Sequence, residues 1–192
     1  MNAETPTEIM EATYQALCEH GYADMTVQRI ADESSLSTAA IHYHFDTKEE
    51  LLIAFLDYLI ERFEQRFACT ANDPRERLET FLHKVFAPED SGDFPIALLE
   101  LKAQAPYHEG YRERFLEVDR HMRDIVAEAV RNGIDGNYFD DADPDTVARS
   151  VVTMINGGHS REVSLGETQE KTRDAVEEYL ELQLGWTPEV MA

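Results

Sequence analysis

The sequence predicts an all-α fold of about nine helices arranged in two domains. Apolar residues recur at spacings of three and four along most of the chain, which is the period of an amphipathic helix. No stretch alternates apolar and polar residues in the manner of a strand, and no internal repeat is visible. Apolar residues make up 43% of the 192 residues and charged residues 29%, so the chain is able to bury a substantial core.

The first three predicted helices are joined by short connections. An apolar face over residues 9–17 predicts the first helix, and Gly21 is placed to end it. Thr26 and Ser37 are suited to cap the second and third helices, because a hydroxyl at that position accepts a hydrogen bond from a backbone N–H. Leu36 lies in the turn between these two helices as an apolar plug.

Six further helices are predicted after this segment. Thr47 and Glu50 form a candidate capping box at the start of a long fourth helix. Proline and glycine punctuate the rest of the chain and separate the later helices. The apolar faces of helices five to nine fall in residues 78–86, 94–105, 111–129, 147–155 and 175–182.

The net charge is unusually negative. The chain has 39 acidic residues against 17 Lys and Arg, which gives a formal charge of −22 and a sequence pI near 4.5. Taken alone, this charge argues against nucleic-acid binding, because phosphate contacts require cations. Proteins that work in molar salt carry dense surface carboxylates and little Lys, and this chain has only four Lys. We favour this salt-adapted interpretation over that of a merely acidic protein.

Other features narrow the class of protein. No apolar run is long enough to cross a membrane, and the acidic N-terminus does not read as a secretory signal, so we expect a cytoplasmic protein. Cys18 and Cys69 are too few for a disulfide scaffold and are interpreted as small buried hydrophobes, with a redox-sensing pair as the alternative. No nucleophile–base pair, metal-ligand cluster or Gly-rich phosphate loop is present. The sequence therefore predicts neither an enzyme nor a cofactor.

The three short helices meet the requirements of a helix-turn-helix. The second helix has the small residue Ala31 where the third must cross it. The third helix has an inner apolar residue, Ile41, and outer polar residues, Thr38 and His42. Residues 34–45 contain no carboxylate, which suits a surface that faces phosphates.

Two segments, residues 26–31 and 36–52, resemble the DNA-binding domain of the tetracycline-repressor (TetR) family of transcriptional regulators. The most specific part is the aromatic run His42-Tyr43-His44-Phe45 before the fourth helix, followed by Lys-Glu-x-Leu-Leu. The match covers about residues 8–56. Ser35 departs from the family pattern, because it replaces the usual glycine of the turn, and a strained or differently shaped turn is expected.

The resemblance implies a division into two domains. Residues 1–50 would form the helix-turn-helix DNA-binding domain, linked through helix four at about residues 47–68. Residues 51–192 would form a ligand-binding and dimerisation domain. The partners implied are a double-stranded DNA operator, a second copy of the chain and a small-molecule effector, with no membrane.

The resemblance also assigns DNA-contacting roles. Thr26 would contact phosphate, Lys48 would add a cation at a helix N-terminus, and Arg29 would reach the DNA backbone. Ala39 and Ala40 would contact thymine methyl groups. The full set of ten is Thr26, Arg29, Ser37, Thr38, Ala39, Ala40, His42, Tyr43, His44 and Lys48.

A dimer interface is predicted over about residues 146–184, where the eighth helix and the last helix would form half of a four-helix interface. Residues 146–161 contain no acid in a chain crowded with carboxylates, and their Gly157-Gly158 pair suits close approach of another backbone. The predicted interface residues are Val147, Val151, Val152, Ile155, Ala175, Val176 and Tyr179. The predicted ligand pocket, which could equally be plain core, uses Phe81, Phe86, Phe115, Met122, Met154 and His159.

The function predicted is a ligand-responsive transcriptional regulator, most simply a repressor, that binds a palindromic operator as a homodimer. The alternative is a helical protein-interaction module whose helix-turn-helix does not bind DNA. A metal shared by His42 and His44 is not expected, because residues two apart on a helix point away from each other. Four scattered histidines are expected at the surface or hydrogen-bonded, with pocket or metal roles as alternatives, namely His83, His108, His121 and His159. Residues 140–143 are expected to be a solvated loop, with a cation-binding role as the alternative.

Overall fold

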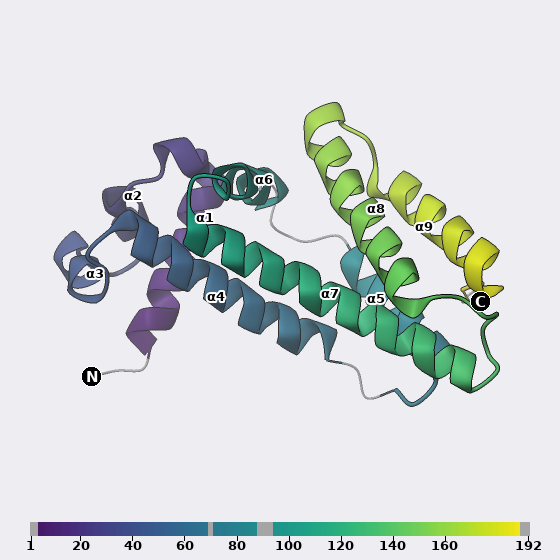
Figure 1. Ribbon diagram of the computed structural model, residues 1–192. Coiled ribbons are helices and arrows are strands. Elements are labelled where there is room, and N and C mark those ends of the chain that lie inside the picture. The colour runs from purple at the N-terminus through teal and green to yellow at the C-terminus, as the bar shows by residue number, and fades with distance from the viewer. Residues whose placement is uncertain (1–3, 69–70, 88–93, 189–192) are drawn as a thin grey trace. The chain divides into compact units, whose positions relative to one another are not determined.

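The structure is a computed structural model that describes residues 4–68, 71–87 and 94–188. These residues form nine α-helices and no strand, which confirms the predicted all-α class (Figure 1). No helix in the described ranges combines the length and apolar character needed to cross a membrane. The helices are α1 (Glu4–Asp24), α2 (Val27–Asp32), α3 (Thr38–His44), α4 (Lys48–Phe67), α5 (Pro74–Val85), α6 (Phe94–Gln104), α7 (Glu109–Asp135), α8 (Pro144–Leu165) and α9 (Gln169–Leu184).

The chain divides into two compact units. The first contains residues 1–63 and 89–117, and the second contains residues 64–88 and 118–192. Helices α4 and α7 therefore each contribute to both units. These units are defined by packing. The predicted boundary near residue 50 separates DNA binding from ligand binding and dimerisation, and it stays a prediction.

The first unit packs α2 and α3 onto a core built from distant parts of the chain. Ile30 of α2 and Ile41 of α3 are fully buried, as are Leu52 and Phe55 of α4. They share one apolar cluster with residues of α1, α6 and the start of α7, including Tyr111. Burial of a side chain of this size contributes about 1.5–3 kcal/mol, so the two short helices depend on this core rather than on their own length.

Local hydrogen bonds fix where the short helices begin. The Thr26 hydroxyl oxygen accepts from Arg29 N at 3.2 Å, and that of Ser37 accepts from Ala40 N at 3.2 Å, as predicted. At the start of α4, Thr47 Oγ1 accepts from Glu50 N at 3.1 Å and the Glu50 carboxylate accepts from Thr47 N at 3.3 Å. The predicted capping box is therefore confirmed.

Helix α1 is interrupted at Gly21, which has φ +69°. This is the left-handed region that favours glycine. Directly after it, Tyr22 N donates to Glu100 Oε2 of α6 at 2.6 Å. A Cβ at Gly21 would lie 2.8 Å from the same oxygen, so a larger residue would also have to displace the Glu100 carboxylate that accepts this hydrogen bond.

The second unit buries one face each of α5, α8 and α9, together with the second part of α7. Phe81, Val130, Val151 and Val176 are at most 2% exposed. Helix α8 begins at Pro144, because the Asp143 carboxylate caps it by accepting from the backbone N–H groups that follow.

Candidate DNA-binding surface

Helix α3 is held to the first unit by one fully buried side chain and exposes most of its remaining surface. Ile41 is 0% exposed, whereas Ala39, His42 and His44 are exposed and the Tyr43 side chain is 76% exposed. Thr38 and Ala40 are partly exposed. An exposed tyrosine on a short helix has no packing role within the protomer, so this face is free to meet another molecule.

The predicted DNA contacts Thr26 and Ser37 are both exposed helix caps. Each hydroxyl oxygen already accepts a backbone hydrogen bond, which leaves its proton available to an external acceptor such as a phosphate oxygen. The structure therefore places these two residues at helix N-termini with a donor still unused.

The turn between α2 and α3 is not strained, contrary to the expectation from Ser35. Among the described non-glycine residues only Asn137 has a positive φ, so Ser35 adopts an ordinary backbone conformation. Its N–H and hydroxyl both donate to Glu8 Oε1, at 3.0 and 2.6 Å. These two hydrogen bonds hold the pKa of the Glu8 carboxyl below its ordinary value. No sequence pattern predicts this contact, because 27 positions separate the partners.

Both cations within residues 1–50 are engaged by the chain's own carbonyl groups. Arg29 Nη1 donates to Asp24 O at 2.6 Å. Lys48 Nζ donates to Tyr22 O and Met25 O at 2.8 Å each, and lies 4.5 Å from the centroid of the Tyr22 ring. Partial burial lowers the pKa of Lys48. Lys48 therefore holds the end of α1 against the start of α4, and its predicted phosphate contact has at most one ammonium proton left.

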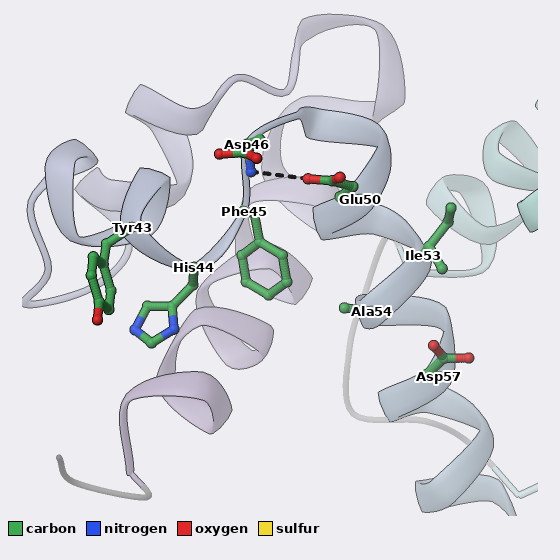
Figure 2. A pocket seen from close by; sticks show the side chains of 8 residues that line it. All are labelled: Tyr43, His44, Phe45, Asp46, Glu50, Ile53, Ala54 and Asp57. Atoms are coloured by element: carbon green, nitrogen blue, oxygen red, sulfur yellow. Dashed lines mark hydrogen bonds between the residues drawn. The ribbon is translucent and has the colours of Figure 1, made fainter.

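An open hollow of about 440 Å³ borders this surface (Figure 2). It is lined by residues at and after the end of α3 and by one side of α4, namely Tyr43, His44, Phe45, Asp46, Glu50, Ile53, Ala54 and Asp57. Two of its three carboxylates have partners. Glu50 accepts from Asp46 N at 3.0 Å, and Asp57 pairs with Arg114 Nε at 2.8 Å. Of these carboxylates, Asp57 is therefore neutralised by a cation, whereas Glu50 is stabilised by a neutral backbone donor.

The predicted dimer-interface residues fall into two groups. Val147, Val151, Val152 and Val176 are at most 2% exposed within the protomer, so they belong to its own core and are unable to contact a partner. The apolar period of a helix identifies a buried face but not which neighbour covers it. Ile155 and Tyr179 are partly exposed and Ala175 is exposed, so these three remain available to a partner.

The two glycines of α8 also differ. A Cβ at Gly158 would lie 2.3 Å from Thr172 of α9, so this glycine permits close packing inside the protomer. A Cβ at Gly157 would meet nothing within 4 Å. The predicted close approach is therefore made by α9 of the same protomer at Gly158. At Gly157 it stays a prediction about a partner chain. Leu182 of α9 is an apolar residue that is 75% exposed, and it is absent from the predicted interface.

The predicted pocket residues do not all lie in one packing unit. Phe115 belongs to the first unit, where Lys102 Nζ lies 5.9 Å from its ring centroid. The other five belong to the second unit. Phe81 and Met122 are buried there, with Phe81 packed against Phe67, whereas Phe86, Met154 and His159 are partly exposed. Their role as a ligand pocket stays a prediction.

The structure shows the surroundings of Cys18 and of two of the four scattered histidines. Cys18 is partly buried, and Cys69 lies outside the described residues, so the redox pair is not tested. His108 Nδ1 lies 3.0 Å from Glu49 Oε1, and His121 Nδ1 lies 3.4 Å from Glu64 Oε1. Within the described chain, none of the four scattered histidines joins a group of three metal-ligating side chains.

The fold and this surface define a helix-turn-helix protein with an additional helical domain. The family model for "Bacterial regulatory proteins, tetR family" matches residues 9–55, and the model for "BetI-type transcriptional repressor, C-terminal" matches residues 74–185. The chain belongs to the TetR family of transcriptional regulators. It is accordingly a DNA-binding repressor rather than an enzyme, and the alternative of a helix-turn-helix that does not bind DNA is not favoured.

Individual relatives agree with this assignment. A TetR transcription regulator from Haloarcula marismortui is 44% identical with a TM-score of 0.91, over 95% of this chain and 100% of that one. The transcriptional repressor AcnR of Corynebacterium diphtheriae is 29% identical over 174 residues, which cover 89% of this chain and 88% of that protein. A regulator from Saccharomonospora viridis in complex with choline shares the fold, with a TM-score of 0.84 and 23% identity over 95% and 98% of the two chains.

Proposed function

We propose that the protein represses transcription as a homodimer that places α3 of each protomer in successive major grooves of a palindromic operator. The observation that carries this proposal is the exposed surface of α3, which rests on Ile41 and contains no carboxylate. Two methyl groups for base edges come from Ala39 and Ala40. Two hydrogen-bonding groups come from Thr38 and His42. Thr26 and Ser37 supply hydroxyl donors for phosphate, and Tyr43 and His44 supply further contacts to the DNA backbone.

The test of this surface is a retardation assay on DNA from the promoter of the protein's own gene. His42→Ala removes the longest hydrogen-bonding side chain among the proposed base contacts, and should weaken operator binding by about 1–3 kcal/mol. Non-specific binding should change little, because the contact reads a base rather than a phosphate. His83→Ala, at an exposed position of α5 in the other unit, is the matched control and should bind as the parent does. If both variants lost operator affinity equally, His42 would not be a base contact of the α3 surface.

The dimer is proposed to form through the outer faces of α8 and α9. The window 146–161 lacks acids on its exposed side as well as on its buried side, and the protomer core explains only the buried side. On α9, Ala175, Tyr179 and Leu182 follow one another at spacings of four and three and form an uncharged stripe. Together with Gly157 these residues provide an uncharged surface in a chain of net charge −22.

The effector is proposed to be a small organic cation that prefers the conformation unable to bind the operator. Two of the predicted pocket residues in the second unit, Phe81 and Phe86, are phenylalanines, and aromatic faces attract quaternary ammonium groups. The match to the BetI-type repressor model and the relative in complex with choline support this class. Choline is therefore the first probe. Trp186, the single tryptophan and 4% exposed, provides the fluorescence signal, with the uncharged 3,3-dimethylbutanol as control.

The acidic charge is proposed to be an adaptation to molar salt in the cytoplasm. Residues 1–50 carry ten acids and two cations, a net charge of 2 − 10 = −8, and both cations already hold backbone carbonyls. Little cationic charge is left to neutralise phosphates, so the protein would bind DNA most readily where mobile cations are abundant.

A further inference from the structure

Three metal-ligating side chains converge where the end of α1 meets the end of α2. Glu19 and His20 lie in the last turn of α1 before the interruption at Gly21. Glu33 is the residue that ends α2, with its N–H bonded to Arg29 O and Ala31 O. One ligand atom from each of the three side chains lies within 4.8 Å of the other two.

In the described part of the chain, the side chains of Glu19, His20 and Glu33 form no hydrogen bond or ion pair with another residue. Two carboxylates this close repel each other, and no Lys or Arg of the described residues forms an ion pair with either of them. Glu19 and Glu33 are exposed and His20 is partly exposed, so an ion could reach all three from solvent.

The donor set distinguishes this group from an ordinary acidic surface. Mg²⁺ and Ca²⁺ take oxygen ligands, whereas an imidazole nitrogen together with carboxylate oxygens suits Zn²⁺ and the neighbouring transition-metal ions. Bonds of about 2.0–2.2 Å to a tetrahedral ion would place ligand atoms roughly 3.3–3.6 Å apart. Small side-chain rotations would close the present spacing to that value and leave a fourth position for water.

We infer that Glu19, His20 and Glu33 form a binding site for one divalent transition-metal ion at this corner of the helix-turn-helix unit. The ion would join α1 to the residue that opens the turn leading to α3. Glu8 holds Ser35 of the same turn, and Lys48 holds the chain just after Gly21, so the ion would add a third tie to a segment already fixed at two points. This inference does not depend on DNA binding.

The experiment is a calorimetric titration of the chelator-treated full-length protein with ZnCl₂ in molar KCl, which screens diffuse binding to the acidic surface. The expected result is one saturable site per chain. His20→Ala and Glu33→Gln should each weaken binding by at least about tenfold. Glu11→Gln removes an exposed carboxylate from the same helix and should leave the affinity unchanged. Circular dichroism of each variant confirms that it is folded.

Two further measurements identify the ligands. Co²⁺ in place of Zn²⁺ should give visible bands of nitrogen and oxygen coordination, and a large excess of Mg²⁺ should not abolish them. Zn²⁺ should raise the unfolding temperature of the parent and of Glu11→Gln but not that of His20→Ala. Equal affinity in the parent and both ligand variants, displacement by Mg²⁺, or a cobalt–thiolate band indicating cysteine ligands would each overturn the inference.

Discussion

Two segments of this chain lack carboxylates, and the structure uses them differently. In residues 34–45 only Ile41 is buried, and the rest of the segment is exposed or partly exposed. In residues 146–161 one side of α8, including Val151, is buried in the protomer core and the other side, including Thr153 and Gly157, faces solvent. A buried face lacks acids because burial of an unpaired charge is costly. An exposed face without acids has no such cause in a chain of net charge −22. In so acidic a protein, an exposed surface without carboxylates therefore indicates contact with another molecule, whereas a buried one does not.

The largest expected effect tests the buried side of α8. Val151→Glu places a carboxylate at a position that is 0% exposed, and an uncompensated buried charge costs roughly 3–5 kcal/mol. Total stability of a domain is about 5–15 kcal/mol, so the variant should unfold at much lower denaturant concentration or fail to fold. Denaturant unfolding followed by circular dichroism measures this.

Thr153→Glu is the companion variant, because it adds the same carboxylate two residues further along on the exposed side. It should retain its helical content at neutral pH. If Val151→Glu were as stable as the parent while Thr153→Glu unfolded, the two sides of α8 would have been assigned in reverse.

The next effect concerns the exposed side of the same helix pair. Leu182→Glu introduces a charge at a leucine that is 75% exposed, so the protomer itself should be little affected. If this face is the dimer interface, the variant should be monomeric by light scattering and should lose operator binding, because a single recognition helix reads only half of a palindrome.

The control is Leu116→Glu, the same substitution at a leucine of α7 that is 54% exposed and belongs to the other unit. It should remain dimeric. A Leu182→Glu protein that also remains dimeric would move the interface away from the outer face of α9.

The sequence predicted best what depends on neighbouring residues. The caps at Thr26, Ser37 and Thr47 were correct because a capping hydrogen bond spans only three positions. The core face of α8 was recognised as apolar, but periodicity alone assigned Val151 to a partner chain instead of the protomer's own core. Nor did it reveal that Lys48 binds carbonyl groups 23 and 26 positions away, since such contacts depend on how α1 packs beside α4.

A smaller effect concerns the support of the α3 surface. Glu8→Gln should lower the unfolding temperature at neutral pH, because the carboxylate that accepts both hydrogen bonds from Ser35 is replaced by a neutral amide. The folded-state pKa of Glu8 is below its unfolded value, so its contribution is complete above the unfolded pKa and is lost as the pH falls through the folded pKa. The difference in unfolding temperature between parent and variant should therefore shrink toward zero in acid.

The parent–variant difference isolates Glu8 from other acid-sensitive groups. Hydrogen bonds also lower the pKa values of Asp73 and Asp143, so the whole protein loses stability in acid for several reasons. Both groups are unchanged in the variant and cancel in the comparison. A temperature difference that stays constant down to strongly acidic pH would show that the Glu8 carboxylate does not support the turn.

The smallest expected effect is the dependence of operator affinity on salt. A regulator that neutralises phosphates with Lys and Arg releases counterions, and its affinity falls steeply as salt rises. Here Arg29 and Lys48 are already bonded to Asp24, Tyr22 and Met25, so the release should be small. Carboxylates that approach DNA would instead require cations between the two negatively charged surfaces, and uptake of cations opposes their release.

The same carboxylates repel one another within the fold, and salt screens that repulsion. Stability should therefore rise with KCl, while operator affinity stays flat or rises into the molar range. The measurement is the logarithm of affinity against the logarithm of salt concentration, taken where circular dichroism shows a folded protein. A steep negative slope, of the size given by about six or more released counterions, would contradict salt adaptation of the DNA-binding surface.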